Sequence, residues 1–525
     1  MAMLPKVLLI GLDGADPDFV EAHKSELPFL SRLLREGTSG RLASTIPPIT
    51  GPAWSSAMSG MNPGRTGVIG FQEDPGDRKS RIVHSHSVAV PRIWDVLSRQ
   101  KLRVGVVAVP MTYPPQPVNG FMISGFLAPV SARRFTYPES LRAELPPDYR
   151  TDLDINKNEA PPEYFLQRLY SFSRVQFQAI EELLQNRDWD FFTFVVSQTD
   201  WIQHIFFDRP DGSDVILRYF QYVDEYLATL EKKLPAGSIV CVISDHGFGK
   251  KTVCHLYLNT WLQREGYLAV KRKPRDTLRS LAGANLRVLG RIPGAGKLKR
   301  RLTPGFKKKL LAATFLRSEQ VDWEKTRAHY SAGDYNTGFI RINRARGREE
   351  DHRRWAAEIV DRLNELNRSE AANPPFRNVC LREEVYRGPL AGRFPEIVIV
   401  FSDKFSGQEV VGRKVIGEIP ISAVPGPAHR MEGIFIIRGP DIKAGLRRNA
   451  DICDVAPTLY HLMGVPLPEG TDGEVLKDIL LPESRPARRD VKYLAYEHNV
   501  AGGFGIKEEE EEDIRERLRA LGYLV

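Results

Sequence analysis

Cysteine is scarce in this chain, and the cysteines present form no recognisable motif. Cys241, Cys254, Cys380 and Cys453 are far apart in the sequence, and no two of them have the CxxC spacing typical of redox or zinc sites. Four thiols in 525 residues are too few for a disulfide framework. A reducing, cytoplasmic setting is therefore expected, with possible attachment to the inner face of the membrane.

Long apolar runs are also absent. No stretch approaches the roughly 18 apolar residues of a membrane-spanning helix, so any membrane role is expected to be peripheral. The early apolar run at 7–12 is about half the length of a signal-peptide core and leads directly into acidic residues. We therefore interpret it as a first strand. Apolar residues make up 42% of the chain and charged residues 27%, as in ordinary globular proteins.

Positive charge is concentrated in one segment. The net charge is +8, but residues 271–309 contain fourteen Lys or Arg and one acid, a local charge of +13, which leaves 8 − 13 = −5 for the remainder. The leucines interleaved over 271–317 suit a basic amphipathic helix on an anionic membrane, and equally a cap helix packed on the core. We expect no specific nucleic-acid binding, because the segment has no aromatic stacking platform.

Short apolar runs alternate with amphipathic stretches along most of the chain. This pattern predicts βα units, and hence an α/β fold in which helices sandwich a mostly parallel sheet, with helical cap insertions. The predicted strands begin at residues 7, 104, 191, 238, 396 and 433. The predicted helices include 163–185 and 214–234. The predicted organisation is a core of 1–265 and 318–485, a helical insertion at 127–190, a basic cap at 266–317 and a tail at 486–525 with an acidic run and a short helix.

Two residues near the start of the chain suggest chemistry. Asp13 ends the first predicted strand between two glycines, where it could bind a metal or serve as a turn residue or helix cap. Thr50 precedes Gly51, Pro52 and a helix-compatible run. A proline in the first helical turn marks a helix amino terminus, which favours bound phosphate. The alternative is a simple threonine N-cap.

Further acidic and imidazole side chains follow other predicted strands. Asp200 and His204 are four residues apart on a predicted helix, a spacing that puts both on one face and suits either a shared cation or a surface pair. Asp245 and His246 end the strand at 238, and His429 precedes the strand at 433. Three Asp, three His and one Thr at strand ends suit a zinc site, or a manganese site if the ligands are harder.

With these motifs the sequence resembles the alkaline phosphatase superfamily, and within it the type I phosphodiesterase and nucleotide pyrophosphatase branch, over roughly residues 5–480. The SDHG string and the DxxxH helix carry the resemblance. It implies a two-metal phosphohydrolase with Thr50 as the nucleophile. It also implies two sets of metal ligands. These are Asp13, Thr50, Asp245 and His246 for one metal, and Asp200, His204 and His429 for the other.

The sequence departs from this branch beside the nucleophile. Nucleotide pyrophosphatases usually read Thr-Phe-Pro-Asn, whereas this chain has Thr50-Gly51-Pro52-Ala53, so the asparagine contact with phosphate is missing. Trp54 stands where sulfatases need arginine, which disfavours sulfatase activity. Gly51, Ala53 and Trp54 are candidates for the substrate pocket, as are Tyr335 and Asn336.

The expected activity is phosphodiester or pyrophosphate cleavage through a phosphothreonine intermediate, with two divalent ions as cofactors. The expected substrate is a small phosphate ester or a lipid head group. One alternative is a phosphoglycerate-mutase-like isomerase or a phosphotransferase on the same metal core. Mutases usually carry a large domain soon after the nucleophile, and the chain has no room for one before the strand at 104. The other alternative is a membrane-surface-binding protein that uses the basic segment.

Overall fold

The computed structural model describes most of the chain, in two compact units. The described residues are 5–73, 81–153, 160–249, 254–271, 321–334, 336–411, 414–418, 428–496 and 506–521. The first unit comprises Met1–Lys250, Tyr386–Phe394 and Gly426–Val525, and the second comprises Lys251–Val385 and Pro395–Pro425. The ranges predicted from the sequence divide the chain differently, because they group 251–265, 318–385 and 395–425 with the core. Most of the predicted basic cap, from residue 272 onward, lies outside the described residues.

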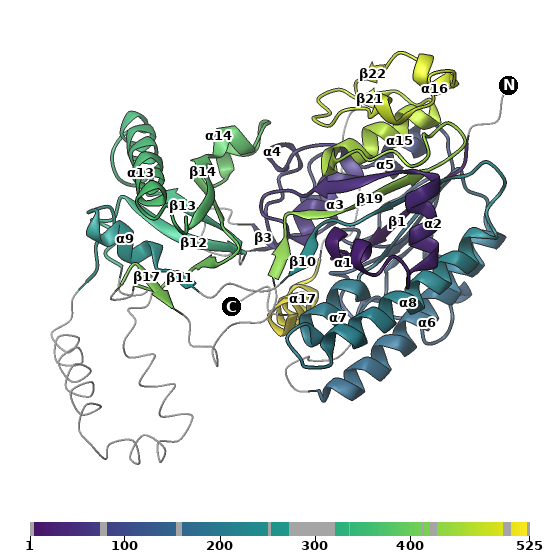
Figure 1. The fold of residues 1–525 in the computed structure, drawn as a ribbon, viewed down its shortest axis with the longest axis horizontal. Helices are drawn as coiled ribbons and strands as arrows, with labels where there is room; N and C mark the ends of the chain where they lie inside the picture. The colour runs from purple at the N-terminus through teal and green to yellow at the C-terminus, as the bar shows by residue number, and fades with distance from the viewer. Residues whose placement is uncertain are drawn as a thin grey trace. The chain divides into compact units, whose positions relative to one another are not determined.

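A nine-stranded sheet forms the centre of the first unit, in the order β20-β2-β19-β9-β1-β8-β5-β6-β7. Its middle strands are β9 (Ile239–Ile243), β1 (Val7–Leu12), β8 (Phe191–Val196), β5 (Val104–Val109) and β6 (Gly120–Ser124). These five run parallel to one another. β9, β1, β8 and β5 are buried along their whole length, which explains why their sequences are continuous apolar runs. The predicted α/β fold is confirmed (Figure 1).

The outer strands of this sheet are shorter or antiparallel. On one side lie β19 (Glu432–Arg438), β2 (Thr38–Ala43) and β20 (Ala450–Asp451), and on the other lies β7 (Thr136–Tyr137). β19 is antiparallel to both of its neighbours, β9 and β2. Only the middle of the sheet therefore has several parallel carboxyl ends side by side, and functional side chains can converge there.

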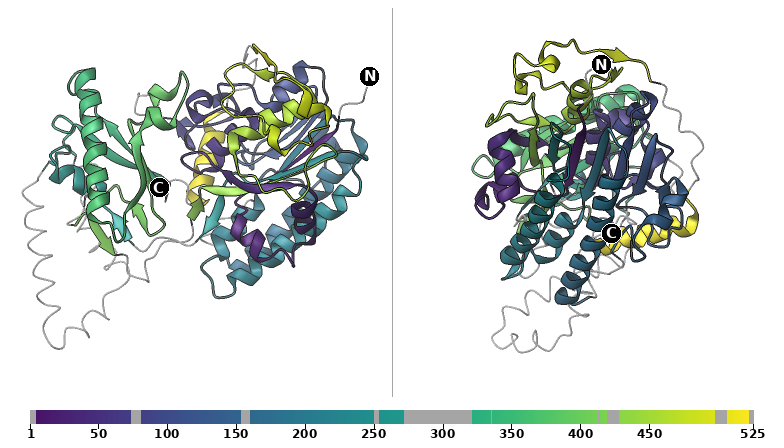
Figure 2. Two further views of the ribbon diagram at one scale, coloured as in Figure 1. Left: turned by 45° about the horizontal axis from the view of Figure 1, so that its top comes forward. Right: turned by 90° about the vertical axis from the view of Figure 1, so that its right-hand side faces the viewer.

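Helices cover both faces of the sheet and create two hydrophobic layers. Leu8 and Ile10 of β1 pack in one layer, with α2 (Pro28–Glu36), α6 (Pro162–Asn186) and α8 (Gly212–Glu231). Val7 and Leu9 point the other way and pack with α3 (Thr50–Ser59), α5 (Ile93–Arg99) and α15 (Val455–Met463). The alternation follows from the two-residue period of a strand. Figure 2 shows the helical layers from two further directions.

The helices predicted at 163–185 and 214–234 correspond to α6 and α8. Because α6 packs against the sheet, much of the region predicted as an insertion at 127–190 contributes to the core of the first unit. The tail contains α17 (Glu508–Leu521), which begins in the acidic run. Among the described residues, no helix is both long and apolar enough to cross a membrane.

The second unit contains the one predicted strand that does not join the main sheet. The apolar run beginning at residue 396 forms β15 (Ile397–Phe401) in an antiparallel four-stranded sheet, in the order β12-β13-β15-β14. Its other strands are β12 (Ala328–Asp334), β13 (Thr337–Ile342) and β14 (Phe376–Leu381). A helix, α13 (Glu349–Ser369), shares the hydrophobic core of this sheet. A continuous apolar run predicts a buried strand but does not identify its partners.

Candidate metal centre

Four of the predicted ligands follow three neighbouring strands of the main sheet. Asp13 comes directly after β1, and Asp200 lies on α7 (Gln198–Phe206), which starts just after β8. Asp245 and His246 follow β9. Since β8, β1 and β9 are adjacent and parallel, their carboxyl ends meet at one edge of the sheet. All four side chains are almost completely buried.

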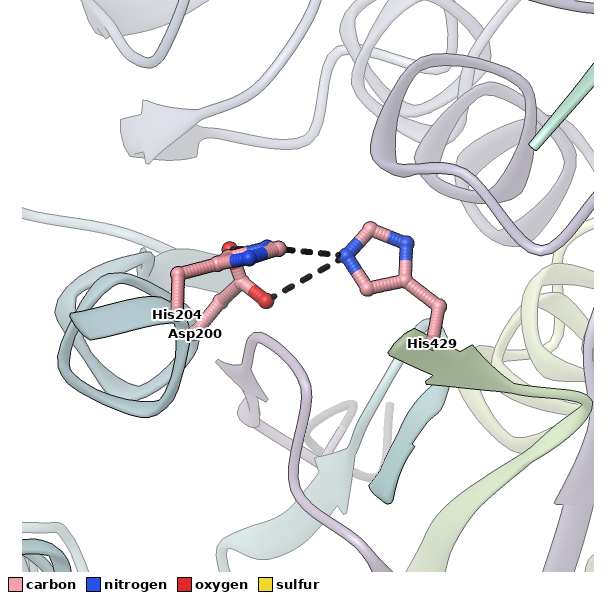
Figure 3. A group of neighbouring side chains, drawn as sticks. All are labelled: Asp200, His204 and His429. Carbon is pink, nitrogen blue, oxygen red and sulfur yellow. Dashed lines mark hydrogen bonds and ion pairs between the residues drawn. The ribbon is translucent and has the colours of Figure 1, made fainter. Parts of the chain in front are cut away.

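The first group of side chains consists of Asp200, His204 and His429 (Figure 3). The helical spacing of α7 brings Asp200 Oδ2 to 3.3 Å from His204 Nε2, as predicted for residues four apart. His429 Nε2 lies 3.5 Å from Asp200 Oδ1 and 3.1 Å from His204 Nε2. Three donor atoms thus converge within 4.8 Å of one another, a separation that one cation can bridge.

The second group is formed by Asp13, Asp245 and His246, with Asp200 at its border. His246 Nε2 lies 3.5 Å from Asp13 Oδ1 and 3.3 Å from Asp245 Oδ2. Donor atoms of Asp13, Asp200 and His246 also lie within 4.8 Å of one another. Asp200 therefore belongs to both groups, which makes the two candidate cation positions immediate neighbours.

A short two-stranded ribbon places His429, although 183 residues separate it from His246. β10 (Gly247–Gly249) pairs antiparallel with β18 (Ala428–Arg430), and Phe248 lies opposite His429. The rings of His429 and His246 stack with their centroids 3.8 Å apart. Two imidazoles stacked this closely disfavour protonation of both rings at once, and neutral imidazole is the form that binds metals.

Hydrogen bonds fix which ring nitrogen of each histidine faces the cluster. His246 Nδ1 is 3.0 Å from the Gly247 carbonyl oxygen, and His429 Nδ1 is 3.1 Å from the Pro48 carbonyl oxygen. A carbonyl oxygen only accepts, so Nδ1 carries the proton in both rings. Nε2 of each ring therefore faces the carboxylates, and it offers a lone pair to a cation when the ring is neutral. This arrangement is typical of metal-binding histidines.

Thr50 is the first residue of α3 and is buried. Pro48, which accepts the hydrogen bond from His429, is two residues before it. Trp54, one helical turn after it, donates from Nε1 to Asp13 Oδ2 at 3.2 Å. The start of α3 is thus connected to one member of each ligand group.

Several supporting side chains were not singled out from the sequence. Ser244 Oγ accepts the Ala15 N–H at 2.8 Å and donates to the His246 carbonyl oxygen at 2.6 Å. Thr199 Oγ1 donates to the Asp13 carbonyl oxygen at 2.6 Å. Gln203 Nε2 donates to the Gly14 carbonyl oxygen at 2.9 Å. Their only sequence signal is proximity to a predicted ligand, since Ser244 begins the SDHG string and Thr199 and Gln203 flank Asp200 and His204.

Burial and mutual repulsion shift the pKa values of the clustered groups. Burial, reinforced by the negative charges of Asp245 and Asp200, raises the pKa of Asp13 well above its usual value. Burial and the Asp200 charge raise the pKa of Asp245 to about 7. Burial alone would raise the pKa of Asp200, but His204 and His429 outweigh it and lower that pKa. Burial lowers the pKa of His246, which keeps the ring neutral.

The donor atoms fit divalent cations. Asp13 Oδ1, Asp245 Oδ2 and His246 Nε2 are buried and have no hydrogen-bond partner among the described residues. Leaving three such polar atoms unsatisfied is costly. A cation would satisfy them and would also offset the repulsion among the three carboxylates. Mixed imidazole and carboxylate ligands are those used for zinc and for harder divalent ions.

The five residues predicted to line the substrate pocket are divided between the two units, and three of them are on α3. A Cβ added at Gly51 would make ordinary van der Waals contacts, 3.6 Å from Phe71 Cε1 and 3.7 Å from Met111 Sδ, so this position faces apolar side chains. Ala53 instead packs in the hydrophobic layer, because its helical position turns it toward the sheet. Trp54 contacts Asp13, as described above.

The other two pocket candidates belong to the second unit. Asn336 lies at the turn between β12 and β13, where its carbonyl oxygen accepts the Phe401 N–H at 2.8 Å. Tyr335 lies outside the described residues.

Comparison with known protein families agrees with this geometry. The family model for type I phosphodiesterase / nucleotide pyrophosphatase matches residues 7–408, more than three-quarters of the chain. The chain belongs to this family. The resemblance to the alkaline phosphatase superfamily is therefore confirmed, and the protein is a phosphoric ester hydrolase. Members of the family act on small phosphate esters such as nucleotides and depend on divalent metals. A search of curated proteins found no match.

Solved structures with the same fold include a nucleotide pyrophosphatase/phosphodiesterase and a phosphonoacetate hydrolase. Murine ectonucleotide pyrophosphatase/phosphodiesterase 5 has 16% sequence identity and a TM-score of 0.51, over 91% of this chain and all of that chain. Phosphonoacetate hydrolase from Sinorhizobium meliloti 1021, in complex with phosphonoformate, has 16% identity and a TM-score of 0.55. That match covers 88% of this chain and 96% of the hydrolase. At these identities the two structures show the shared fold.

Proposed function

We propose that the protein cleaves phosphodiester or pyrophosphate bonds by two successive displacements, with Thr50 as the nucleophile. The observation that carries this proposal is the position of Thr50 at the start of α3, where Trp54 contacts Asp13 and Pro48 contacts His429. A hydroxyl held beside both ligand groups is in position to attack a phosphorus bound between them.

Two divalent cations are proposed to bind the two groups of side chains. Asp13, Asp245 and His246, together with Thr50, would hold one, and Asp200, His204 and His429 would hold the other. Zinc suits this donor set best, and manganese is the alternative. Bound cations supply positive charge that lowers the pKa of a nearby hydroxyl and neutralises phosphoryl oxygens.

The proposed reaction has two steps, attack by Thr50 and then attack by water. Thr50 Oγ1 attacks phosphorus as the bond to the leaving oxygen breaks, the hydroxyl proton passes through solvent to that oxygen, and a phosphothreonine ester forms. Water then attacks the same phosphorus, and Thr50 regains a proton as its bond to phosphorus breaks. Pro52 has no N–H and the Ala53 N–H donates to the Ile49 carbonyl oxygen at 3.0 Å, so the Thr50 and Gly51 amides at the start of α3 are the ones we assign to the developing negative charge.

One solved relative offers a further argument for threonine and for nucleotides. The structure of a murine ectonucleotide pyrophosphatase/phosphodiesterase 5 variant, in which one threonine is replaced by alanine, is described as inactive and contains AMP. We propose a small phosphate diester as the substrate of the present chain. Lipid head groups and contact with an anionic membrane stay predictions, since the basic segment on which they depend lies outside the described residues.

Hydrolysis of bis(4-nitrophenyl) phosphate and 4-nitrophenyl phosphate tests this proposal. Metal-stripped protein should be inactive and should recover on addition of Zn²⁺ or Mn²⁺, with the diester preferred. Thr50→Ala should lose about 10³-fold or more in kcat while it retains cation binding, and Thr50→Ser should keep measurable turnover. Full activity of Thr50→Ala would exclude threonine as the nucleophile.

A further inference from the structure

The C-terminal helix α17 has no role in the reaction proposed above. It lies beyond residues 7–408, to which the family model extends, and it begins with five consecutive glutamates. It is nevertheless firmly packed, because Ile514 and Leu518 are buried in the same hydrophobic layer as α6 and α8. A solvated tail would not bury two aliphatic side chains. The residues that α17 contacts therefore indicate its role.

Arg517 connects α17 to the helix that carries two predicted ligands. Its guanidinium donates two hydrogen bonds of 2.8 Å to the two oxygens of the buried Asp152. The same guanidinium lies 5.6 Å from the ring centre of Trp201, which is also buried. The paired bonds fix the orientation of the guanidinium, and the indole face attracts its charge. Trp201 is adjacent in sequence to Asp200, the carboxylate shared by both ligand groups.

The acidic run at the start of α17 holds two other segments. Glu510 accepts a hydrogen bond of 2.7 Å from the Tyr113 hydroxyl, two residues after Met111 in the loop that follows β5. Glu511 accepts the Ile82 N–H at 3.1 Å. The next residue, Val83, donates its N–H to the Phe71 carbonyl oxygen at 3.0 Å.

Both segments lead to the immediate surroundings of the nucleophile. Met111 and Phe71 are the two side chains nearest to a Cβ added at Gly51, directly after Thr50. α17 therefore contacts three segments of the chain that lead to the candidate site. One contact reaches the helix of Asp200, and two reach the segments that carry the apolar walls beside Thr50.

We propose that α17 is a positioning element of the active site, in which Arg517 orients Asp200 through Trp201 and the glutamates hold the walls beside Thr50. This proposal rests on the proposed function, because it assigns Asp200 to the cations. A helix that only stabilised the fold would change the melting temperature when altered and leave cation affinity and KM unchanged. A positioning element changes cation affinity in otherwise folded protein.

Arg517→Met and Arg519→Met form a matched pair for the test. Both replace an arginine of α17 by an apolar side chain of similar length. Arg519 is largely exposed and pairs with Glu512 at 3.1 Å, away from Trp201. Arg517→Lys keeps a positive charge over Trp201 but cannot make the paired contact with Asp152. It serves as the second variant if Arg517→Met lowers the yield of folded protein.

The measurement is Mn²⁺ affinity of the full-length protein by calorimetry, alongside thermal unfolding and the KM for bis(4-nitrophenyl) phosphate. Arg517→Met should weaken Mn²⁺ binding by about tenfold, as expected for residues that orient metal ligands, and Arg519→Met should not. Glu510→Gln should raise KM more than it weakens Mn²⁺ binding. Equal Mn²⁺ affinities for native protein, Arg517→Met and Arg519→Met would overturn the proposal.

Asp200→Asn separates this inference from the function on which it rests. If the proposed function holds, this variant loses Mn²⁺ binding regardless of what α17 does. Loss of binding in Asp200→Asn with none in Arg517→Met contradicts only the positioning role. Native Mn²⁺ binding by Asp200→Asn contradicts the metal centre itself, and the role of α17 with it.

Discussion

The indole of Trp54 donates a hydrogen bond of 3.2 Å to one carboxylate oxygen of Asp13, and both side chains are buried. Gly11 makes this contact possible, because a Cβ at that position would clash with Trp54 Cη2. Since Trp54 is one turn after Thr50 on α3, it connects the proposed nucleophile to a proposed ligand. The Trp54 N–H also occupies Oδ2 of Asp13, so that Oδ1 of Asp13 faces His246.

Replacing Trp54 by Phe should therefore weaken divalent cation binding by about tenfold. Phenylalanine keeps most of the apolar packing but loses the N–H that orients Asp13. The expected result is a higher dissociation constant for Mn²⁺ and a lower kcat, with a modest change in melting temperature.

Trp94→Phe is the matched control for this change. Trp94 is equally buried in the same hydrophobic layer, but its Nε1 has no hydrogen-bond partner among the described residues. It should lose similar packing while cation affinity is unchanged. Identical Mn²⁺ affinities for the two variants would show that the Trp54 bond does not orient a ligand.

The two ligand groups predict a specific pattern of metal stoichiometry. Asp200 has donor atoms in both groups, whereas His204 belongs only to the first. Asp200→Asn should therefore disturb both cations and His204→Gln mainly one. Metal analysis after gel filtration should give about two ions per native chain, about one for His204→Gln and fewer for Asp200→Asn. Two ions retained by all three proteins would contradict the assignment.

Cation binding should depend steeply on pH near neutrality. With the pKa of Asp245 raised to about 7, the metal-free protein holds a proton there below that pH, and a cation must displace it. Apparent Mn²⁺ affinity should fall by about tenfold per pH unit below 7 for each proton displaced. Calorimetry in buffers of different ionisation enthalpy counts these protons. An affinity independent of pH between 5 and 7 would contradict the assignment.

The same shift has an opposite consequence for the stability of the metal-free protein. Because the folded pKa of Asp245 lies above the unfolded value, the folded state holds more protons between about pH 4 and 7, and stability is lost as pH rises through that window. Asp245→Asn removes this effect. The metal-free variant should be more stable than metal-free native protein at pH 8, with the difference shrinking toward pH 4, as followed by urea unfolding.

The space beside Gly51 predicts tolerance of a side chain there. A Cβ would make ordinary contacts with Phe71 and Met111, and the φ of Gly51 is not in the left-handed region. Gly51→Ala should fold with native stability, within about 0.5 kcal/mol, and bind Mn²⁺ normally. It should raise KM for bulky diesters more than for methyl 4-nitrophenyl phosphate. A loss of folded protein would show that glycine is required by the backbone.

Much of the fold and of the candidate site was predictable, because parallel strands gather their carboxyl ends. The runs at 7, 104 and 191 form β1, β5 and β8 with the predicted bounds. Asp13, Asp200 and Asp245 each follow a buried strand, so the sheet alone brings them together. The exception is the run at 396, which is equally apolar but pairs antiparallel in the second unit. An apolar run in the sequence indicates that a strand is buried, but it does not indicate which strands it pairs with.

Contacts between distant side chains could not be predicted. The Trp54 to Asp13 bond spans 41 residues, and the Arg517 to Asp152 bond spans 365. Neither hydrogen bond produces a local pattern in the sequence, because each depends on the path that the backbone takes between the two partners. Trp54 could be noticed from its place near Thr50, but its contact with Asp13 depends on α3 packing against β1 at Gly11.

The stereochemical course at phosphorus tests the central claim most directly. A chiral phosphorothioate diester is hydrolysed in ¹⁸O-labelled water, and the configuration of the product is determined by ³¹P NMR. Two displacements, first by Thr50 and then by water, each invert the centre and predict net retention. Net inversion would show that water attacks the substrate directly and would contradict Thr50 as the nucleophile.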